Sequence, residues 1–340
     1  MLSEKQTKEI RNHLEKAQNP LFFFDNDNDG LCGFLLLRRA YDRGKGVAVK
    51  SFPDLNESYL RKIDELNPDY VFILDKPIVA PEFILGLKER NIPVVWIDHH
   101  DVEVERESLD YVYYYNDTDT PVTYICWKVV ENKEDMWIAM VGCISDNYLP
   151  DFAEEFAKEN PDLFKKVDKA FDALYNTDIG KIGRVFNFGL KDSITKVVMM
   201  IKFLFKVKSP YDVLKESREN NFLWKRFEFL DGKYQKILEK AKNSVKDNLV
   251  FFEYSGDFSM SADLSNELSY LYPGKIVVVA YIMGEKVNVS FRGKNVLKIT
   301  EKVINGLVGA RGGGHRDATG ASLSKGDLEE FKSRVEREVL

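Results

Sequence analysis

The sequence predicts an α/β protein of two domains, the first built on a doubly wound parallel sheet. Short apolar runs alternate with amphipathic helical segments over the first hundred residues, and the links between them are short. This alternation is typical of parallel sheets that are covered by helices on both faces. The chain has 340 residues, of which 44% are hydrophobic. Because single cores rarely grow beyond about 250 residues, we expect a second domain.

The elements of the first domain follow in a regular order. We expect helices over 3–17, from Gly30 to Asp42, and over 57–66, 81–90, 122–132 and 137–145. The strands are expected over 21–24, 47–52, 70–75, 94–98 and 111–115. Ser3 and Gln6 have the spacing of a capping box at the start of the first helix.

The second half of the chain changes character twice. Residues 151–247 carry helical periodicities and no strand-like alternation, whereas from 249 onward apolar runs return at 250–254, 276–281 and 287–291, with a helix near 262–271. We therefore expect a first domain over 1–190, a helical connector over 191–247, and a smaller α/β domain with its own sheet over 248–340. The active-site cleft is expected between the two domains.

Composition argues against several classes of protein. The three cysteines, Cys32, Cys126 and Cys143, lack CxxC spacing, which argues against a disulfide framework or a thiolate zinc site. The amino terminus lacks the apolar core of a signal peptide. The most apolar helical window, 197–207, is too short to span a bilayer. We expect a cytoplasmic protein that binds no membrane, and the net charge of -6 still allows local basic patches.

Acidic residues and histidines collect at the ends of three predicted strands. They are Asp25, Asp27 and Asp29 before Gly30, then Asp75, then Asp98, His99 and His100, with Asp146 at the end of a later helix. Converging carboxylates repel one another unless cations neutralise them, so the pattern indicates bound divalent metal. Oxygen and imidazole donors without thiolates favour Mn²⁺ or Mg²⁺. Two ions about 3.5–4 Å apart, sharing a carboxylate, would clamp a phosphoester and activate a hydroxide.

The few histidines sharpen this prediction. The chain has four, and His99, His100 and His315 lie in motif-like positions, whereas we interpret His13 as a packing residue. Asp98 is expected to act indirectly, by orienting a ligand imidazole.

A second candidate site lies near the carboxyl terminus. We interpret residues 311–316, with the sequence Arg-Gly-Gly-Gly-His-Arg, as a glycine-rich loop flanked by cations. A glycine run alone could equally be a flexible loop. Ser290 and Arg292 on the preceding strand add a hydroxyl and a guanidinium, and between Lys286 and Arg316 seven Lys or Arg accompany one acid. The combination predicts phosphate binding.

With these residues assembled, the chain resembles the DHH phosphoesterase superfamily, in the subfamily with a carboxyl-terminal DHHA1 domain. The resemblance covers nearly the whole chain and rests on five motifs: Asp-x-Asp-x-Asp-Gly at 25–30, Asp75, Asp98-His99-His100, Asp146, and Gly-Gly-Gly-His at 312–315. The superfamily includes RecJ-type exonucleases, oligoribonucleases that also act on phosphoadenosine phosphate, and cyclic-dinucleotide phosphodiesterases. Archaeal RecJ-like proteins are the group that this chain resembles most.

The resemblance implies a role for each residue, centred on two divalent ions, most often Mn²⁺, with Mg²⁺ as the alternative. Asp75 would bridge the ions, Asp25 and Asp27 would hold one, and Asp29, His99 and Asp146 the other. Asp98 and His100 would be catalytic, with His100 contacting the scissile phosphate. Substrate binding would fall to Ser290, Arg292, Gly312, Gly313, Gly314, His315 and Asn266, and Asn116 also occupies a recurrent family position.

The chain departs from the family pattern at two positions. Many relatives carry a histidine two residues before the first motif aspartate, where this chain has Phe23. Asp75 is followed by Lys76 and Pro77 instead of small residues, which puts a cation near the predicted site. The extra oligonucleotide-binding domain of long bacterial RecJ proteins is not expected here.

Three functions stay open at this stage. The first is a RecJ-like exonuclease that hydrolyses single-stranded DNA or RNA to mononucleotides. The second is a phosphodiesterase for short oligonucleotides, phosphoadenosine phosphate or cyclic dinucleotides. The third is a scaffold like the replisome factor Cdc45, which the intact set of metal ligands disfavours. Expected partners are single strands or short oligonucleotides, with replisome or repair proteins and a homodimer left open.

Overall fold

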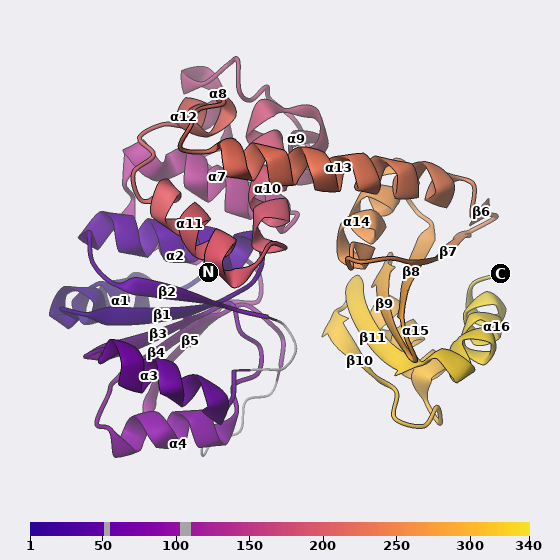
Figure 1. The fold of residues 1–340 in the computed structure, drawn as a ribbon, viewed down its shortest axis with the longest axis horizontal. Helices are drawn as coiled ribbons and strands as arrows, with labels where there is room; N and C mark the ends of the chain where they lie inside the picture. Colours follow the sequence, from indigo (N-terminus) through magenta and orange to yellow (C-terminus); the bar gives the residue numbers. More distant parts are fainter. Residues whose placement is uncertain (51–54, 103–109) are drawn as a thin grey trace. The chain divides into compact units, whose positions relative to one another are not determined.

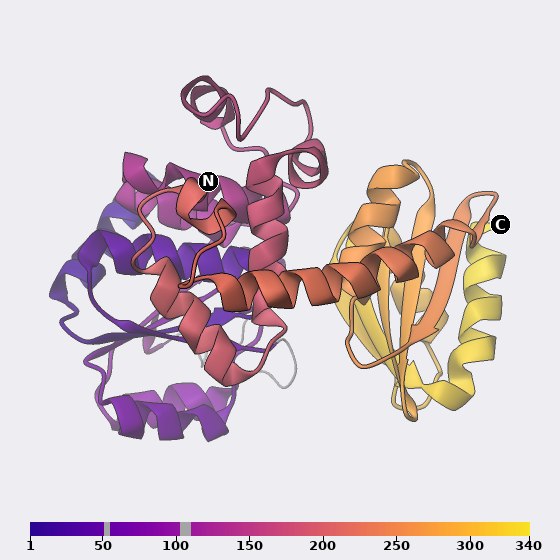
Figure 2. The ribbon, with the colours of Figure 1, turned by 45° about the horizontal axis from the view of Figure 1, so that its top comes forward.

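The computed structural model describes residues 1–50, 55–102 and 110–340 and divides into two compact units, Met1–Phe227 and Glu228–Leu340 (Figure 1). This confirms the predicted α/β class with two units. The unit boundary falls inside helix α13 (Asn221–Lys242), which is one continuous helix (Figure 2). The helical segment expected over 191–247 is therefore divided between the units.

The first unit contains a five-stranded, all-parallel sheet, as predicted, with the strand order β2-β1-β3-β4-β5. The strands are β1 (Pro20–Asp25), β2 (Lys45–Val49), β3 (Tyr70–Leu74), β4 (Val94–Asp98) and β5 (Val112–Asn116). Strand β2 ends three residues earlier than expected, and positions 51 and 52 of the predicted strand lie outside the described residues.

Both faces of this sheet are buried, which explains the continuous apolar runs. On β1, Leu21 and Phe23 belong to the core beneath α3 (Leu60–Leu66) and α4 (Pro81–Glu89). Phe22 and Phe24 point to the opposite face, where their ring centroids lie 5.3 and 4.9 Å from that of Phe34 on α2 (Asn28–Tyr41). Side chains alternate along a strand, so helices on both faces require an apolar residue at every position.

The remaining helices of the first unit lie mainly over the α2 face of the sheet (Figure 1). They are α1 (Glu4–Lys16), η1 (Glu57–Tyr59), α6 (Val122–Val130), η2 (Lys133–Asp135), α7 (Met136–Ser145), α8 (Ala153–Glu159), α9 (Ala170–Asn176), α10 (Asp178–Leu190), α11 (Ile194–Leu204) and α12 (Pro210–Leu214). The capping box of Ser3 and Gln6 is present. Nowhere in the described ranges is a helix long and apolar enough to cross a membrane.

Close contact between α2, α6 and α7 brings the ends of these helices to the sheet edge. A Cβ at Gly142 of α7 would lie 2.2 Å from Oγ1 of Thr123 on α6 and 2.8 Å from Cβ of Cys32 on α2. Only a glycine allows this approach. The start of α6 and the end of α7 are thereby placed beside the start of α2.

The second unit is a six-stranded mixed sheet in the order β10-β11-β9-β8-β7-β6. Its elements are β6 (Val245–Lys246), β7 (Leu249–Ser255), α14 (Ser261–Leu271), β8 (Ile276–Met283), β9 (Lys286–Arg292), α15 (Val296–Ile304), β10 (Arg311–His315), β11 (Ala318–Ser324), η3 (Lys325–Asp327) and α16 (Leu328–Val339). Strands β7 and β8 are parallel and joined by α14, and the other pairs are antiparallel. The core lies between the sheet and α15 and α16, and α14 packs on the opposite face.

The predicted glycine-rich loop is wrong, because Arg311–His315 forms the edge strand β10 and pairs with β11. Glycine is depleted in strands in general, but here the close packing of α15 requires it. A Cβ at Gly312 would lie 2.9 Å from Cδ1 of Ile304 and 3.1 Å from Cγ2 of Thr300, both on α15. Gly314 has φ +134°, a backbone conformation that residues with a Cβ rarely adopt.

Candidate metal centre and phosphate-binding surface

The carboxyl ends of three neighbouring strands place the acidic cluster. Strands β1, β3 and β4 lie side by side in register, with Phe24 opposite Leu74 and Leu74 opposite Ile97. The next residues along the three strands are Asp25, Asp75 and Asp98. Parallel strands end at the same edge of a sheet, so the three carboxylates meet there.

The turn between β1 and α2 depends on Gly30. A Cβ at this position would lie 2.6 Å from the carbonyl oxygen and 2.7 Å from the nitrogen of Asp25. Asp27 is the N-cap of α2, and its Oδ1 accepts a hydrogen bond from the Gly30 N–H at 3.0 Å. Gly30 therefore lets the chain fold back tightly enough for Asp25 and Asp27 to flank one point.

The two asparagines of this turn anchor it to the helical layer. Nδ2 of the buried Asn28 donates to Oγ of Ser145 on α7 and to the carbonyl oxygen of Gly183 on α10, both at 2.8 Å. Asn26 Nδ2 donates to the carbonyl oxygen of Leu190 at 3.3 Å. The sequence prediction assigned these residues no role, although asparagine at both positions between the aspartates was a usable signal.

Asp29 holds the start of α6 in place. Its two carboxylate oxygens accept the backbone N–H groups of Val122 at 2.8 Å and Thr123 at 2.7 Å, and Oγ1 of Thr123 donates to the Asp29 carbonyl oxygen at 2.9 Å. Amide groups in the first turn of a helix have no partners within the helix, and a carboxylate there is favourable. A metal ion bound by Asp29 would share its carboxylate with these two amides.

Asp75 lies at the centre of the cluster with one oxygen available. It has φ +58°, an uncommon conformation for a residue with a side chain. Within the described part of the chain, its buried Oδ1 has no hydrogen-bond partner. Nε2 of His99 lies 3.3 Å and Nδ1 of His100 lies 3.8 Å from this oxygen. A buried carboxylate oxygen is rarely left unsatisfied, so this atom fits a position beside a bound cation.

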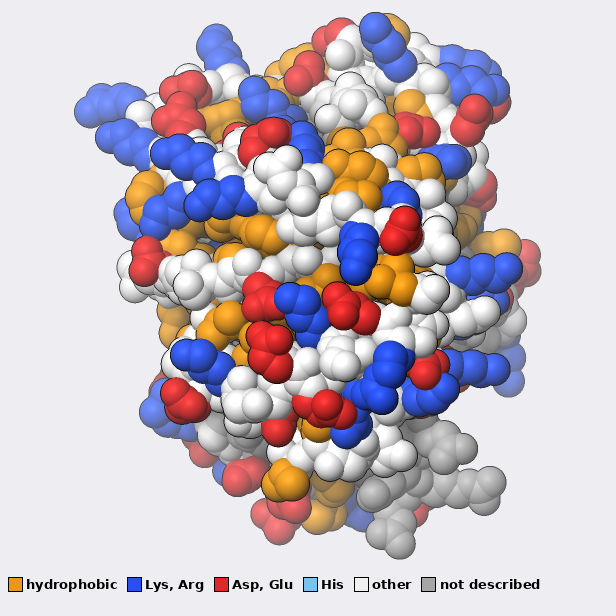
Figure 3. Space-filling model, turned by 90° about the vertical axis from the view of Figure 1, so that its right-hand side faces the viewer, with side chains coloured by type: hydrophobic (Ala, Val, Ile, Leu, Met, Phe, Trp, Pro, Cys, Tyr) orange, Lys and Arg blue, Asp and Glu red, His pale blue; other side chains and the backbone are white. Residues whose placement is uncertain are grey.

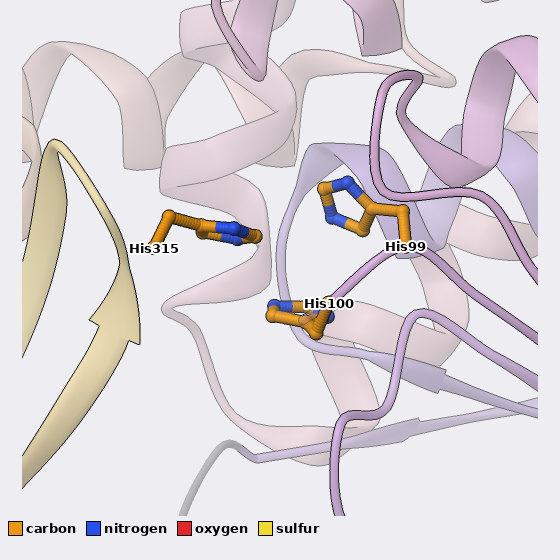
Figure 4. A group of neighbouring side chains, drawn as sticks. All are labelled: His99, His100 and His315. Atoms are coloured by element: carbon orange, nitrogen blue, oxygen red, sulfur yellow. The ribbon is translucent and has the colours of Figure 1, made fainter. Parts of the chain in front are cut away.

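Figure 4 shows the rings of His99 and His100, which follow β4 directly, and the contacts of the two rings differ. His100 Nδ1 lies 3.0 Å from Oδ1 of Asp98, and the carbonyl oxygen of His100 accepts a hydrogen bond from Nδ2 of Asn116 at 2.9 Å. His99 Nδ1 lies 3.9 Å from Oδ2 of Asp146, at the end of α7. Asp98 therefore orients His100, and His99 points into the acidic cluster.

All six predicted metal ligands come together in two groups. Asp25, Asp27 and Asp75 have ligand atoms within 4.8 Å of one another, and so do Asp29, His99 and Asp146; a further group, Asp75, Asp98 and His100, meets the same separation. Most of the donors are carboxylate oxygens, which suit Mn²⁺ and Mg²⁺, and none is a thiolate. The orphaned Oδ1 of Asp75 and this donor set fit bound divalent metal.

Electrostatic crowding is strong in the metal-free protein. Burial, followed by the charges of Asp27, Asp29, Asp25 and Asp98, raises the pKa of Asp75 well above its usual range. Burial and the neighbouring Asp25 and Asp29 raise the pKa of Asp27 to about 7. Burial lowers the pKa of His100, but the hydrogen bond and charge of Asp98 outweigh it, with help from Asp146 and Asp27, so the net shift is upward. A bound cation would stabilise the ionised form of these carboxyl groups and lower their pKa.

Lys76 is a cation that the fold itself brings to the Asp25 side of the cluster. Its side chain is 2% exposed, and its Nζ lies 3.1 Å from Oδ1 of Asp25. The indole N–H of Trp96 donates to the Lys76 carbonyl oxygen at 2.9 Å and fixes the backbone. The sequence indicated a nearby cation but not its burial.

The predicted substrate residues of the second unit share one face of its sheet. Arg292 on β9 pairs with Ala318 on β11, which pairs with His315 on β10. Paired residues of antiparallel strands point to the same side, so Arg292 and His315 flank a small alanine. Ser290, two residues earlier on β9, points to the same side and pairs with Gly320, which in turn pairs with Gly313.

Glycine keeps part of this face clear. A Cβ at Gly313 would meet no described atom within 4 Å, and one at Gly320 would meet only a backbone oxygen at 3.7 Å. Gly312 and Gly314 face the other side, toward α15. The glycine run therefore has two uses, close packing against α15 at Gly312 and an open backbone at Gly313.

Two polar pairs fix the rim of the face. Arg292 Nε donates to Oδ1 of Asn266 on α14 at 2.5 Å, and Arg292 Nη1 donates to the Phe291 carbonyl oxygen at 2.6 Å. Oγ of the buried Ser290 donates to Oγ of Ser261 at 3.0 Å. His315 ends strand β10 (Figure 4). The face thus carries a held guanidinium and an imidazole beside open backbone, which suits an anionic ligand.

Charge is mixed on the face of the molecule that Figure 3 shows. In Figure 3, lysine and arginine side chains are interspersed with aspartate and glutamate over the face that is turned to the viewer. Anion recognition is therefore better sought in specific groups such as Arg292 than in a general positive surface.

Comparison with known proteins agrees with this geometry. Residues 246–339 match the family model described as DHHA1 domain. The carboxyl-terminal part of the chain is a DHHA1 domain. No curated protein sequence gives a significant match.

Solved structures extend the likeness to the whole chain. RecJ from Thermus thermophilus in complex with Mn²⁺ has a TM-score of 0.68 and 16% identity, over 99% of this chain and 55% of that one. An exonuclease RecJ bound to manganese has a TM-score of 0.65 and 16% identity, over 99% of this chain and 95% of that one. The pGpG-specific phosphodiesterase PggH from Vibrio cholerae has a TM-score of 0.51 and 14% identity, over 94% of this chain and 98% of that one. The chain, which spans about half of the Thermus protein, has the two-domain fold of these RecJ structures.

Proposed function

We propose that this protein is a divalent-metal-dependent phosphodiesterase that degrades single-stranded DNA or RNA from an end to mononucleotides, in the manner of a RecJ exonuclease. The observation that carries the proposal is the buried Oδ1 of Asp75, which has no hydrogen-bond partner among the described residues. Asp75 belongs to one candidate ligand group with Asp25 and Asp27, and its Oδ1 lies 3.3 Å from Nε2 of His99, a member of the other group. The similarity to RecJ folds supports the proposal.

The residues of the cluster divide into two ligand groups around Asp75. Asp25 and Asp27 would hold one ion with Asp75, and Asp29, His99 and Asp146 would hold the other. When bound, two such ions supply Lewis-acid stabilisation of the phosphoryl oxygens and lower the pKa of an attacking water. Mn²⁺ suits the mixed oxygen and imidazole donors, and Mg²⁺ is the alternative.

In this proposal, His100 acts on the substrate. If its Nδ1–H donates to Asp98, the raised pKa favours the doubly protonated ring, whose Nε2–H can donate to a phosphate oxygen. The bond from Asn116 to the His100 carbonyl fixes the backbone below the ring. Asp98 is thus a positioning residue that keeps His100 oriented and charged.

The DHHA1 domain would bind the substrate through its open sheet face. Arg292 has its orientation set by Asn266, and a guanidinium can form two parallel hydrogen bonds with a phosphate. The clear backbone at Gly313 would let a phosphate or sugar approach the sheet. His315 would add a second donor, and the buried Ser290, whose hydroxyl donates to Ser261, would support this face from beneath.

A time course on end-labelled single strands tests the proposal. Long DNA and RNA strands of matched sequence, labelled separately at each end, are incubated with Mn²⁺ and with EDTA. We expect stepwise shortening with Mn²⁺, none with EDTA, and a loss of several orders of magnitude in Asp75→Asn. Intact long strands with the wild-type protein would contradict the exonuclease proposal, and undiminished cleavage by Asp75→Asn would contradict the metal centre.

A second candidate is hydrolysis of short oligonucleotides or small nucleotides. It is favoured by the match to PggH, a pGpG-specific phosphodiesterase of which the fold covers 98%. The same assay with dinucleotides and trinucleotides separates the two, because activity confined to these substrates would move the assignment to an oligonucleotidase.

A further inference from the structure

We propose that Lys76 is a built-in counter-ion of the metal centre that makes its two halves unequal. The Lys76 ammonium neutralises Asp25, so an ion in the Asp25–Asp27–Asp75 group binds more weakly than an ion in the Asp29–His99–Asp146 group. The inference deepens the proposed function and rests on the metal-binding part of it.

Burial makes the ion pair between Lys76 and Asp25 persistent. The lysine side chain is 2% exposed and the Asp25 side chain 14%, and Nζ lies 3.1 Å from Oδ1. An ammonium group without water is costly unless it is paired, so the folded protein strongly disfavours release of Asp25. The ammonium group of an exposed lysine would instead be hydrated and could leave its carboxylate partner freely.

The backbone around Lys76 fixes the direction of its side chain. Asp75 takes the left-handed conformation with φ +58°, and Pro77 follows Lys76. The indole of Trp96, itself buried, holds the Lys76 carbonyl oxygen at 2.9 Å. Since proline restricts the residue before it to extended conformations, the segment has little freedom to turn Lys76 away.

The consequence for metal binding follows from charge. A divalent ion in the Asp25 group must share this carboxylate with an ammonium and approach a positive charge nearby. In the other group, Asp29 accepts neutral backbone amides, and His99 lies 3.8 and 3.9 Å from the carboxylates of Asp29 and Asp146. Repulsion between like charges in a partly buried site is large enough to separate two affinities.

The experiment measures Mn²⁺ binding to the full chain by titration calorimetry, with free Mn²⁺ followed by electron paramagnetic resonance. The wild-type protein should show one tight and one weaker binding step. Lys76→Met keeps an unbranched, apolar side chain of similar length and should tighten the weaker step about tenfold or more. Without metal, the same variant should melt at a lower temperature, because the acidic cluster loses its counter-ion.

Two controls make the result specific. Lys332→Met removes a lysine whose Nζ also lies 3.1 Å from a carboxylate oxygen, that of Glu253 in the DHHA1 domain, and should leave both steps unchanged. Circular dichroism checks that Lys76→Met folds. If it does not, the Mn²⁺ titration is repeated with Lys76→Gln. Two equal steps in the wild type, or a weaker step unmoved in Lys76→Met, would overturn the inference while leaving the proposed function standing. Absence of any Mn²⁺ binding to the wild type would overturn both.

Discussion

His100 and Asp98 are joined twice, because Asp98 Oδ1 lies 3.0 Å from Nδ1 of the His100 ring and Asp98 Oδ2 accepts the His100 backbone N–H at 3.2 Å. The two contacts fix the ring against the backbone of its own turn. Asp98 is almost fully buried, so its charge acts through little water. The pair therefore sets both the direction and the protonation of His100.

Replacing Asp98 by asparagine should keep the shape of this turn and remove its charge. The net rise in the pKa of His100 depends on the hydrogen bond and charge of Asp98, so the pKa should fall in Asp98→Asn. If the protonated ring is the active form, activity is lost as the pH rises through this pKa. The high-pH limb of kcat/KM should move to lower pH, and kcat should fall about 100-fold. Asp101→Asn, an exposed acid of the same segment, is the control, and an unmoved limb in Asp98→Asn would exclude this role.

Gly30→Ala should damage the metal centre without replacing a ligand side chain. The new Cβ would lie 2.6 Å from the Asp25 carbonyl oxygen, a backbone atom that cannot move without shifting the turn. We expect Mn²⁺ affinity to fall about 10–100-fold, as for other groups that hold ligands in place. Gly232→Ala, in α13 where no described atom would lie within 4 Å of the new Cβ, should bind Mn²⁺ normally. Equal affinity in both variants would show that the turn tolerates a side chain.

The stability of the metal-free protein should fall as the pH rises. The pKa of Asp27 is about 7 in the folded, metal-free protein, against an ordinary value of 3.8. The folded state therefore holds a proton that the unfolded state releases, and the stability gained from it is complete below about pH 4 and lost as the pH rises through about 7. In EDTA, the melting temperature should be lower at about pH 8 than at about pH 5.

Asp27→Asn should reduce the change in melting temperature between about pH 5 and pH 8. Saturating Mn²⁺ should have the same effect on the wild-type protein. Asp64→Asn serves as the comparison, because Arg90 lowers the pKa of this exposed residue, the opposite direction. A melting temperature that rises between these two pH values in EDTA would contradict the assignment of the acidic cluster.

The sequence predicted the part of this molecule that local pattern controls. Parallel strands end at one edge, so apolar runs that stop at Asp25, Asp75 and Asp98 could be placed together without coordinates. The pattern could not show long-range packing. Asn28 reaches α10, far away in the sequence, and the burial of Lys76 depends on the turn made by Asp75.

The prediction of a loop at the glycine run 312–314 was wrong for a related reason. A run of glycines normally indicates a loop, because glycine gains nothing from side-chain packing in a strand. Here a neighbouring helix approaches so closely that only glycine fits at Gly312, and that contact is invisible in a linear sequence. Local propensity was overridden by tertiary packing.

The last prediction concerns the hold of Asn266 on Arg292. In Asn266→Ala the guanidinium loses its 2.5 Å hydrogen bond and gains freedom, so more entropy is lost when it binds a phosphate. If Arg292 binds the substrate equally well in the ground and transition states, KM should rise about tenfold with kcat unchanged. Arg292→Lys should show the same pattern, because an ammonium lacks the fork of a guanidinium. Arg337→Ala, which removes an exposed arginine paired with Glu330 on α16, is the matched control and should leave KM unaltered. A fall in kcat with constant KM in Asn266→Ala would instead place Arg292 in the chemical step, where the alignment of the guanidinium with the reacting phosphate matters more than capture.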